Sequence, residues 1–350
     1  RVVEDWLLIS WNAKFLLLKM KEIVHIAFCV DSKNVSCLSV ALKSIATFSS
    51  TNFAYVVHIV HDGLTYVEQG LLRSVCLDRK NFSFDFIDVG VLGDVFSKLF
   101  ISSYLSNATY WRFALPDYLK DLEKVIYLDA DLVVLEDVAN LFFQDVEDLA
   151  LGACLDWGVV YPSAFSHSTD ERAKLEKLGY IDFSRYFNAG VLLLNLKFFR
   201  KEQLSLKLLK LAQENSFHMH DQDALNVLLN GKFKVLDHRW NFAVHPNITK
   251  YDCQVQKEIE DSISKMNMSI IHYVGAKKPW VSENGPLRKV WVMFAVQTPF
   301  YVGKVLCPRS EDERKILASR PKKWRKYRRR LEEIFIPKFL HDLKKRIIKK

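Results

Sequence analysis

Residues that interrupt regular secondary structure are scarce in this chain. It contains 12 glycines and 9 prolines among 350 residues, with no internal repeat and no low-complexity linker. Apolar residues make up 49% of the sequence, which is typical of a packed globular protein and argues against a disordered one. This length suits either one large α/β domain with an appendage or two domains.

Paired cysteines and long hydrophobic runs are also missing. The six cysteines include no C-x-x-C pair, and Cys29 and Cys154 lie in apolar segments, so we expect reduced core residues and a reducing, cytoplasmic compartment. The apolar cluster in residues 1–19 is broken by Asn12 and Lys14 and is too short to span a bilayer. No small-residue cleavage site follows it, which argues against a signal peptide. We predict that residues 1–19 are an extension outside the folded domain.

Positive charge is concentrated at the C-terminal end. Residues 321–350 contain 13 Lys and Arg against 3 Asp and Glu, so residues 1–320 carry 37 basic and 38 acidic groups. Aromatic and apolar residues are interleaved with the basic ones in this tail. The pattern suits an anionic membrane surface, and we predict that residues 301–350 form basic helices that attach the protein peripherally to a membrane. Nucleic acid is the competing partner for such a cluster, and a solvated basic helix is the simplest alternative.

Apolar segments alternate with amphipathic ones between these two ends. Strands are predicted over residues 23–30, 54–60, 82–89, 124–128, 149–155, 186–195, 233–237 and 269–274. Helices are predicted over residues 34–48, 65–77, 106–120, 170–178, 197–215 and 221–230. Strands that are apolar on both faces and alternate with helices predict a mainly parallel sheet covered on both faces. In such sheets ligands bind at the carboxyl ends of the strands.

Two carboxylates directly follow the predicted strand at residues 124–128. Side chains alternate along an extended chain, so Asp129 and Asp131 should point the same way and Ala130 should point back. Two such carboxylates repel each other unless a cation lies between them. Mg²⁺ or Mn²⁺, which typically takes one or two carboxylates plus substrate phosphates, is the usual answer. A solvated loop at the end of a strand is the alternative.

A second polar segment follows the last predicted strand. His272 could complete the coordination of a metal through a ring nitrogen. Gly275 would let the backbone approach an anion, and one of the lysines at 277 and 278 could neutralise phosphate oxygens. Considered alone, His272 is more often a hydrogen-bonded core or loop residue than a metal ligand.

In combination these segments resemble glycosyltransferase family 8, and within it the bacterial lipopolysaccharide α-1,2-glucosyltransferases and α-1,3-galactosyltransferases. The resemblance covers residues 23–280 and rests on the segments IAFCVD (26–31), YWRF (110–113), YLDAD (127–131), YFNAGV (186–191), HDQDALN (220–226) and HYVGAKKPW (272–280). It implies a GT-A type α/β fold over residues 20–300, a Rossmann-like, mainly parallel sheet with helices on both faces. It also implies retaining, metal-dependent transfer of a hexose from UDP-glucose or UDP-galactose to the lipid-linked core oligosaccharide of lipopolysaccharide or lipooligosaccharide.

The resemblance also implies roles for individual residues. Asp129, Asp131 and His272 would coordinate Mn²⁺, or Mg²⁺, bridging the donor diphosphate. The nucleotide-binding residues it implies are Ala27 and Asp31 for uracil and ribose, and Gly275 and Lys278 for the diphosphate. The residues it implies around the transferred hexose are Arg112, Asn188, Asp156, Asp221 and Gln222. Lys33 departs from the family pattern, because relatives can have an asparagine there that helps to bind the nucleotide.

Gln222, Asp221 and Asp156 are the candidate catalytic residues for a retaining reaction. Double displacement needs a nucleophile, and an amide is a poor one whereas a carboxylate is a good one. We therefore favour front-side attack through an oxocarbenium-like ion pair, with Gln222 stabilising positive charge. The implied location is the cytoplasmic face of the bacterial inner membrane, with the basic tail on the anionic lipid surface.

Several of these residues also have purely structural interpretations. Asp31 and Asp221 could cap the helices that follow them. Arg112 could pair with Asp117 or Asp121 on the exposed side of its helix, a contact that would contribute little.

Two other classes of function share some of these features. A nucleotidyltransferase would also bind a metal through carboxylates on a parallel sheet, but residues 30–34 lack the glycine-rich phosphate loop expected after the first strand. A nucleic-acid-binding protein would explain the tail but not the nearly balanced charge of residues 1–320, so we expect no nucleic-acid partner. The sequence leaves the choice between UDP-glucose and UDP-galactose open.

Overall fold

The computed structural model describes residues 21–90, 99, 107–160, 168–244, 257, 261–262, 265, 267–275, 278–281 and 287–301. The extension predicted at residues 1–19 lies outside these ranges, and so does the basic tail predicted over residues 301–350, apart from Tyr301. None of the helices that the structure describes has the length and apolar character needed to cross a lipid bilayer.

The first half of the main sheet alternates strands and helices as predicted. Its elements are β1 (Ile23–Val30), α2 (Val35–Phe48), β2 (Ala54–His61), α3 (Tyr66–Ser74) and β3 (Phe82–Asp88). β1 pairs in parallel with β2, and β2 pairs in parallel with β3. Asp31 caps the short 3-10 helix η1 (Ser32–Asn34), and Thr65 forms a capping box with Glu68 at the start of α3.

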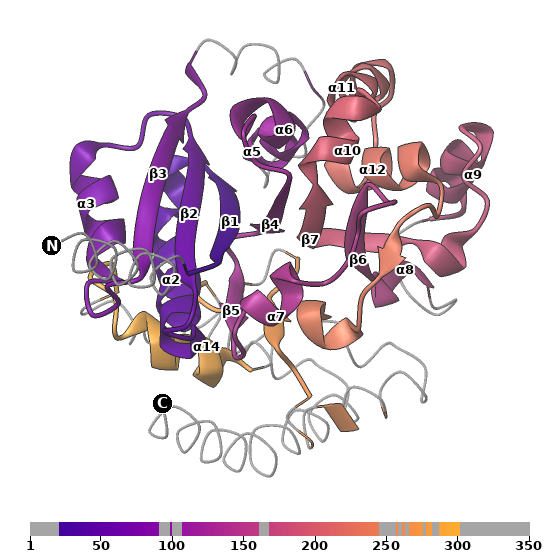
Figure 1. The fold of residues 1–350 in the computed structure, drawn as a ribbon. Coiled ribbons are helices and arrows are strands. Elements are labelled where there is room, and N and C mark those ends of the chain that lie inside the picture. The colour runs from indigo at the N-terminus through magenta and orange to yellow at the C-terminus, as the bar shows by residue number, and fades with distance from the viewer. Residues whose placement is uncertain are drawn as a thin grey trace, which may run out of the picture.

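The second half of the sheet contains one antiparallel strand. Its strands are β4 (Lys124–Leu128), β6 (Leu151–Leu155), β7 (Phe187–Asn195) and β8 (Lys234–Val235). The order across the sheet is β3-β2-β1-β4-β7-β6-β8, and β7 runs antiparallel to both of its neighbours (Figure 1). β4 is parallel to β1, and β8 is parallel to β6. The predicted α/β class, with a mixed but mainly parallel sheet, is confirmed.

The helix predicted over residues 106–120 consists of short pieces. They are α5 (Ala108–Trp111), η3 (Arg112–Ala114) and α6 (Leu115–Tyr118). Pro116 lies in the first turn of α6, where its missing N–H and fixed φ are tolerated but where a continuous helix from residue 106 would be interrupted. The change of helix type at η3 directs Arg112 into the protein, where it is buried.

The helix predicted over residues 197–215 is divided in two. α10 (Leu196–Lys201) and α11 (Leu204–Glu214) are separated at Gln203, which has a φ of 53° and therefore cannot continue a right-handed helix. The remaining helices of the described residues are α7 (Ala139–Phe142), α8 (Trp157–Val160), α9 (Thr169–Lys177), η4 (Phe183–Arg185), α12 (Asp221–Leu229), η5 (His238–Asn241) and α14 (Arg288–Ala295).

The central strands of the main sheet are buried on both faces. In β1, Ala27 and Cys29 belong to one hydrophobic cluster and Ile26 and Phe28 to the other, as the alternation of side chains along a strand requires. Residues of α5, α6, α10, α11 and α12 complete the first cluster, and residues of α2 and α3 complete the second. The cysteines of this core, including Cys29 and Cys154, are unpaired and buried, as the sequence predicts.

A second, smaller sheet continues directly from β4. It contains β5 (Leu132–Val134), β9 (Phe242–Ala243) and β10 (Ile270–His272), in the order β5-β10-β9. β10 is antiparallel to β5 and parallel to β9. The sequence pattern predicts β10 but not β5, which consists of three apolar residues directly after the turn at 129–131. This small sheet joins the two polar segments that the sequence places far apart.

Candidate active site

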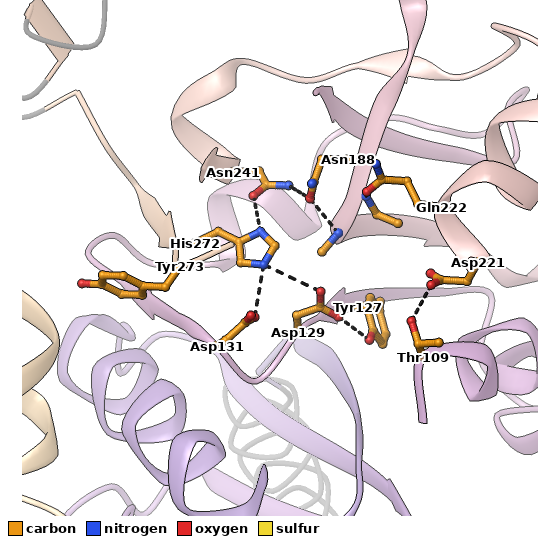
Figure 2. Close-up of polar contacts among 12 residues, drawn as sticks. Thr109, Tyr127, Asp129, Asp131, Asn188, Asp221, Gln222, Asn241, His272 and Tyr273 are labelled. Carbon is orange, nitrogen blue, oxygen red and sulfur yellow. Dashed lines mark hydrogen bonds and ion pairs between the residues drawn. The ribbon is translucent and has the colours of Figure 1, made fainter. Parts of the chain in front are cut away.

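Three side chains from the two sheets meet beyond the carboxyl end of β4. Asp129 and Asp131 lie in the turn between β4 and β5, and His272 is the last residue of β10. Because His272 lies opposite Leu132 in the antiparallel pair, its ring reaches the turn. Nε2 of His272 lies 3.1 Å from Oδ1 of Asp131 and 3.7 Å from Oδ2 of Asp129 (Figure 2). Ala130 packs against the hydrophobic core, as expected of the residue that points back.

The chemistry of these three side chains fits a divalent cation. One ligand atom from each can be chosen so that all lie within 4.8 Å of one another. Oδ1 of Asp131 is buried and faces Nε2 of His272 at 3.1 Å, so two potential ligand atoms point at each other in the protein interior. Carboxylate oxygens suit Mg²⁺ and Mn²⁺, and imidazole is a frequent ligand of transition metals. The cluster can therefore hold a divalent ion.

Lys278 lies against the same carboxylate. Its ammonium contacts Oδ2 of Asp131 and donates to the carbonyl oxygen of Tyr273 at 2.7 Å. Burial acts to raise the pKa of Asp131, but Lys278 and His272 outweigh it and hold that pKa below its ordinary value. Asp131 is therefore ionised at neutral pH. Gly275 has a φ of 78°, a conformation that glycine adopts without steric cost.

The two predicted nucleoside contacts lie on β1 and just after it. Ala27 is fully buried in the hydrophobic cluster of one sheet face. Oδ1 of Asp31 accepts hydrogen bonds from the backbone N–H and the side-chain amide of Asn34. The capping interpretation of Asp31 is therefore confirmed. Lys33, the position that departs from the family pattern, is exposed.

Arg112 is buried between two carboxylates. Its guanidinium lies 3.0 Å from Asp129 and 3.1 Å from Asp221. Burial acts to lower the pKa of Arg112, but the two carboxylates outweigh it and raise that pKa. The alternative interpretation, an exposed pair with Asp117 or Asp121, is wrong because η3 turns this side chain inward. Arg112 therefore connects a predicted metal ligand to a predicted sugar-binding residue.

Asp221 is the first residue of α12, but its side chain does not cap the helix. The Thr109 hydroxyl donates to Oδ1, whereas Oδ2 has an ion pair with Arg112 and no hydrogen bond from the described residues. Burial raises the pKa of Asp221 to about 6, with Arg112 and Thr109 acting in the opposite direction. His220 occupies the cap position, so the capping interpretation of Asp221 is wrong. Oδ2 of Asp221 is left as a buried acceptor for a ligand.

Asp156, Asn188 and Gln222 form a second buried polar group, on the side of the site away from β1. Asn188 Nδ2 and Gln222 Nε2 both donate to Oδ2 of Asp156, each at 3.0 Å. Oδ1 of Asp156 accepts from the backbone N–H of Gly158 at 2.8 Å, and Oε1 of Gln222 accepts from the N–H of Ala189 at 3.0 Å. The structure thus joins three of the residues predicted around the hexose through direct hydrogen bonds.

The family model for glycosyl transferase family 8 matches residues 25–284, a range that contains every residue of the site described above. This chain belongs to glycosyltransferase family 8.

Relatives of this family 8 member include bacterial enzymes that act on lipopolysaccharide. General stress protein A of Bacillus subtilis is 25% identical over 272 residues, which cover 76% of this chain and 90% of the relative. Lipopolysaccharide 1,2-glucosyltransferase of Escherichia coli is 26% identical over 282 residues, 77% of each chain. Lipopolysaccharide 1,3-galactosyltransferase of Salmonella typhimurium is 28% identical over 181 residues, 50% of each chain. The chain spans only 50% to 60% of the length of several further relatives.

The fold is shared with the galactosyltransferase LgtC. LgtC in complex with donor and acceptor sugar analogues superposes with a TM-score of 0.62 at 23% identity, covering 80% of this chain and 100% of LgtC. The predicted GT-A type fold of family 8 is therefore confirmed.

Three polar residues of the site were not singled out from the sequence. The Tyr127 hydroxyl donates to Oδ1 of Asp129 at 2.6 Å, Thr109 donates to Asp221, and Asn241 contacts the ring of His272. Tyr127 stands two residues before Asp129 in a strand, so the alternation of side chains could have identified it. Thr109 and Asn241 meet partners that are distant in the sequence, and no local pattern marks them.

Because Gly190 in β7 has no side chain, the side chains of Asp129 and His272 can occupy the space beside it. A Cβ built on it would lie 2.7 Å from Nδ1 of His272 and 2.9 Å from Oδ2 of Asp129. We therefore expect Gly190→Ala to displace both side chains and to lower the free energy of unfolding by about 1–3 kcal/mol, as overpacking does. Binding of Mn²⁺ should weaken by about tenfold or more. Chemical denaturation and calorimetric titration measure the two effects.

Gly70 in α3 provides the matched control for this substitution. A Cβ at Gly70 meets nothing within 4 Å, and the residue lies in a helix. Gly70→Ala should therefore stabilise the protein by up to about 1 kcal/mol and leave Mn²⁺ binding unchanged. A Gly190→Ala protein that binds Mn²⁺ as tightly as the Gly70→Ala protein would contradict this account of Gly190.

Proposed function

We propose that this protein transfers a glucosyl or galactosyl group from a UDP-sugar to a hydroxyl of the lipopolysaccharide or lipooligosaccharide core, with retention of configuration and with Mn²⁺ or Mg²⁺ bound. One observation carries the proposal. Asp129, Asp131 and His272 converge so that one potential ligand atom from each lies within 4.8 Å of the others. Membership of family 8 and similarity to two lipopolysaccharide transferases support the reaction and the acceptor.

The cation-binding cluster would lie at the diphosphate of the donor. A divalent ion held there supplies Lewis-acid stabilisation of the negative charge that develops on the leaving UDP. The ammonium of Lys278 lies beside Asp131 and can neutralise a phosphate oxygen as a point charge. Gly275 presents backbone without a side chain at the same edge. Ala27, within β1, and Asp31, directly after it, would lie on the nucleoside side of the site.

The donor hexose would bind between Asp221 and the group formed by Asp156, Asn188 and Gln222. Oδ2 of Asp221, which is ion-paired with Arg112 but receives no hydrogen bond from the described residues, can accept one from a sugar hydroxyl. Arg112 holds Asp221 in place through a buried ion pair. These contacts orient the sugar but suit both glucose and galactose, which differ in the orientation of one hydroxyl.

Retention is proposed to proceed by front-side attack. A covalent intermediate needs an available nucleophile, but both oxygens of Asp156 accept hydrogen bonds, and Asp221 is held by Thr109 and Arg112. The amide of Gln222 is fixed by Asp156 and Ala189, so its dipole can stabilise an oxocarbenium-like ion. Intact-protein mass spectrometry after incubation with donor should show no glycosylated species. A hexose trapped on Asp156, Asp221 or Gln222 would contradict this mechanism.

The two alternative functions have a direct experimental discriminator. The turn after β1 is the 3-10 helix η1, and its sequence contains no glycine for a phosphate-binding loop, which disfavours a nucleotidyltransferase. Thermal unfolding should shift upward with UDP plus Mn²⁺ and stay unchanged with single-stranded DNA, because only a bound ligand stabilises the native state. A shift with DNA alone would favour the nucleic-acid-binding alternative.

Peripheral attachment to the cytoplasmic face of the inner membrane is proposed from the sequence of the tail. Residues 321–350 carry 13 basic residues interleaved with apolar ones. Deleting residues 310–350 should abolish co-sedimentation with vesicles of phosphatidylglycerol, because about 1 kcal/mol of attraction per Lys or Arg is removed. Vesicles of phosphatidylcholine are the control and should bind neither protein. Persistent binding of the truncated protein to the anionic vesicles would show that the tail is not the anchor.

A further inference from the structure

A row of buried polar side chains connects the predicted sugar-binding group to the predicted metal cluster. Asn188 contacts Asp156. Asn241 contacts Asn188, and His272 contacts Asn241 (Figure 2). The distances are 3.0 Å, 2.8 Å and 2.9 Å in that order. All four side chains are less than a tenth exposed, so protein groups and not bulk water satisfy them.

The direction of each hydrogen bond in this row is fixed from the Asp156 end. An ionised carboxylate only accepts, so Asn188 must present its Nδ2 to Asp156. The Oδ1 of Asn188 independently accepts from the backbone N–H of Gly190 at 2.9 Å, and a backbone N–H can only donate. The second lone pair of that same Oδ1 accepts from Nδ2 of Asn241. Two unambiguous groups therefore orient both amides.

The orientation of Asn241 in turn selects the protonated nitrogen of His272. With its Nδ2 directed at Asn188, Asn241 turns Oδ1 toward Nδ1 of His272, and this oxygen can only accept. Nδ1 must then carry the hydrogen. Nε2 is the ring nitrogen that faces Asp131 and Asp129, so in the neutral ring its lone pair lies on the side of the carboxylates, where a divalent ion would bind.

We infer that Asn241 is a positioning residue that holds His272 in the form with hydrogen on Nδ1, so that Nε2 is the atom that binds the divalent ion. The inference rests on the metal-dependent function proposed above and adds to it a residue outside the predicted site. Partners that hydrogen-bond to the second nitrogen of a metal-binding histidine fix its orientation and raise its basicity. Here the partner is an amide whose own direction is set by Asp156 and Gly190, so the sugar side and the metal side of the site are linked.

The test distinguishes the effect of the acceptor oxygen of Asn241 on metal binding from the effect of the packing of its side chain. Asn241→Leu removes the oxygen and should weaken Mn²⁺ binding by about 10–100-fold, the usual cost of losing such a partner. Asn241→Asp keeps an oxygen that accepts from Nδ1 but cannot donate to Asn188, and it should bind Mn²⁺ within about threefold of the unchanged protein, because the hydrogen bond that orients the ring survives. Calorimetric titration of the full chain with MnCl₂, without nucleotide, measures these affinities.

Asn195, the last residue of β7, supplies a matched control away from the metal cluster. It is also buried, its Nδ2 donates to the carbonyl oxygens of Val146 and Glu147, and its Oδ1 accepts from the N–H of Phe198. Asn195→Leu should lower the melting temperature and leave Mn²⁺ affinity unchanged. Asn241→Ala, which removes the same oxygen without adding bulk, replaces Asn241→Leu if the latter does not fold.

Two results would contradict the inferred role of Asn241, and a third would contradict the metal site on which it rests. The inference fails if Asn241→Leu or Asn241→Ala binds Mn²⁺ as tightly as the unchanged protein. It also fails if Asn241→Asp loses as much Mn²⁺ affinity as those two variants, because a packing role of Asn241 would then explain all the losses. An unchanged protein that binds neither Mn²⁺ nor Mg²⁺ would instead contradict the proposed metal site itself. Activity is not needed for any of these readouts.

Discussion

Replacing Asp131 by asparagine is expected to slow UDP release by about a thousandfold, which corresponds to about 4 kcal/mol of transition-state stabilisation. The substitution keeps the shape of the side chain but removes the negative charge that faces His272 and Lys278. A bound metal contributes several kcal/mol of charge stabilisation, and it is this contribution that the variant loses. Mn²⁺ affinity should fall together with the rate.

The fold should survive this change, because Lys278 is partly exposed and can turn toward solvent. Asp121→Asn, the same chemical change at an exposed position, is the control and should keep the full rate. The measurement is UDP release with saturating donor, with circular dichroism to confirm that both variants are folded. An Asp131→Asn protein that retains more than about a tenth of the rate, a loss of less than 1.4 kcal/mol, would show that Asp131 is not a required ligand.

Arg112→Met is expected to lower the free energy of unfolding by about 3–5 kcal/mol at pH 7.5, because it leaves two carboxylates without their buried cation. The side chain of Asp221 is 6% exposed and cannot replace Arg112 with water. The guanidinium of Arg112 also donates to the carbonyl oxygen of Ala189 at 2.5 Å, and this carbonyl would lose its donor. Urea denaturation monitored by fluorescence measures the loss.

The pH dependence of this variant follows from the pKa of Asp221. In the native state burial raises that pKa to about 6, above the unfolded value of 3.8, so the native state binds more protons between these values. Stability from this group is present below pH 3.8 and is lost as pH rises through about 6. Without Arg112 the pKa rises further, so the destabilisation of Arg112→Met should be smaller at pH 5.5 than at pH 7.5.

Arg239 provides the comparison for a partly exposed pair. It lies 3.1 Å from Glu136, and its side chain is 35% exposed. Arg239→Met should therefore cost no more than about 1 kcal/mol, with little dependence on pH. If Arg112→Met costs as little as Arg239→Met, Arg112 does not hold Asp129 and Asp221 in the way described here.

The strands of the main sheet were predictable because their signal is local. The run of apolar residues in β1 and the Asp31 that ends it appear together in the sequence, and the structure places both within a residue of expectation. The direction of β7 was not predictable, because an apolar strand buried on both faces reads the same in a parallel and an antiparallel neighbourhood. The division of residues 197–215 depends on one backbone angle at Gln203, for which the sequence carries no turn signal.

In the candidate site, too, the sequence predicts the local features but not the contacts between side chains that are distant in the sequence. Asp129 and Asp131 could be paired from their spacing alone, and the resemblance to family 8 joined His272 to them. The partners of Arg112 could not be derived, because they are set by the way η3 rotates the side chain into the core. Asn241 could not be found, because its role follows from hydrogen-bond directions that start at Asp156, far away in the sequence.

The most direct test of this account is metal-dependent release of UDP from a donor sugar. The full chain is incubated with UDP-glucose or UDP-galactose and a purified core oligosaccharide, with Mn²⁺, with Mg²⁺, or with EDTA. We expect one of the two donors to release UDP with metal present, and EDTA to reduce the rate by at least about a hundredfold, or about 2.7 kcal/mol, with recovery on addition of Mn²⁺. Undiminished release in EDTA, or no release from either donor under any condition, would contradict the central claim.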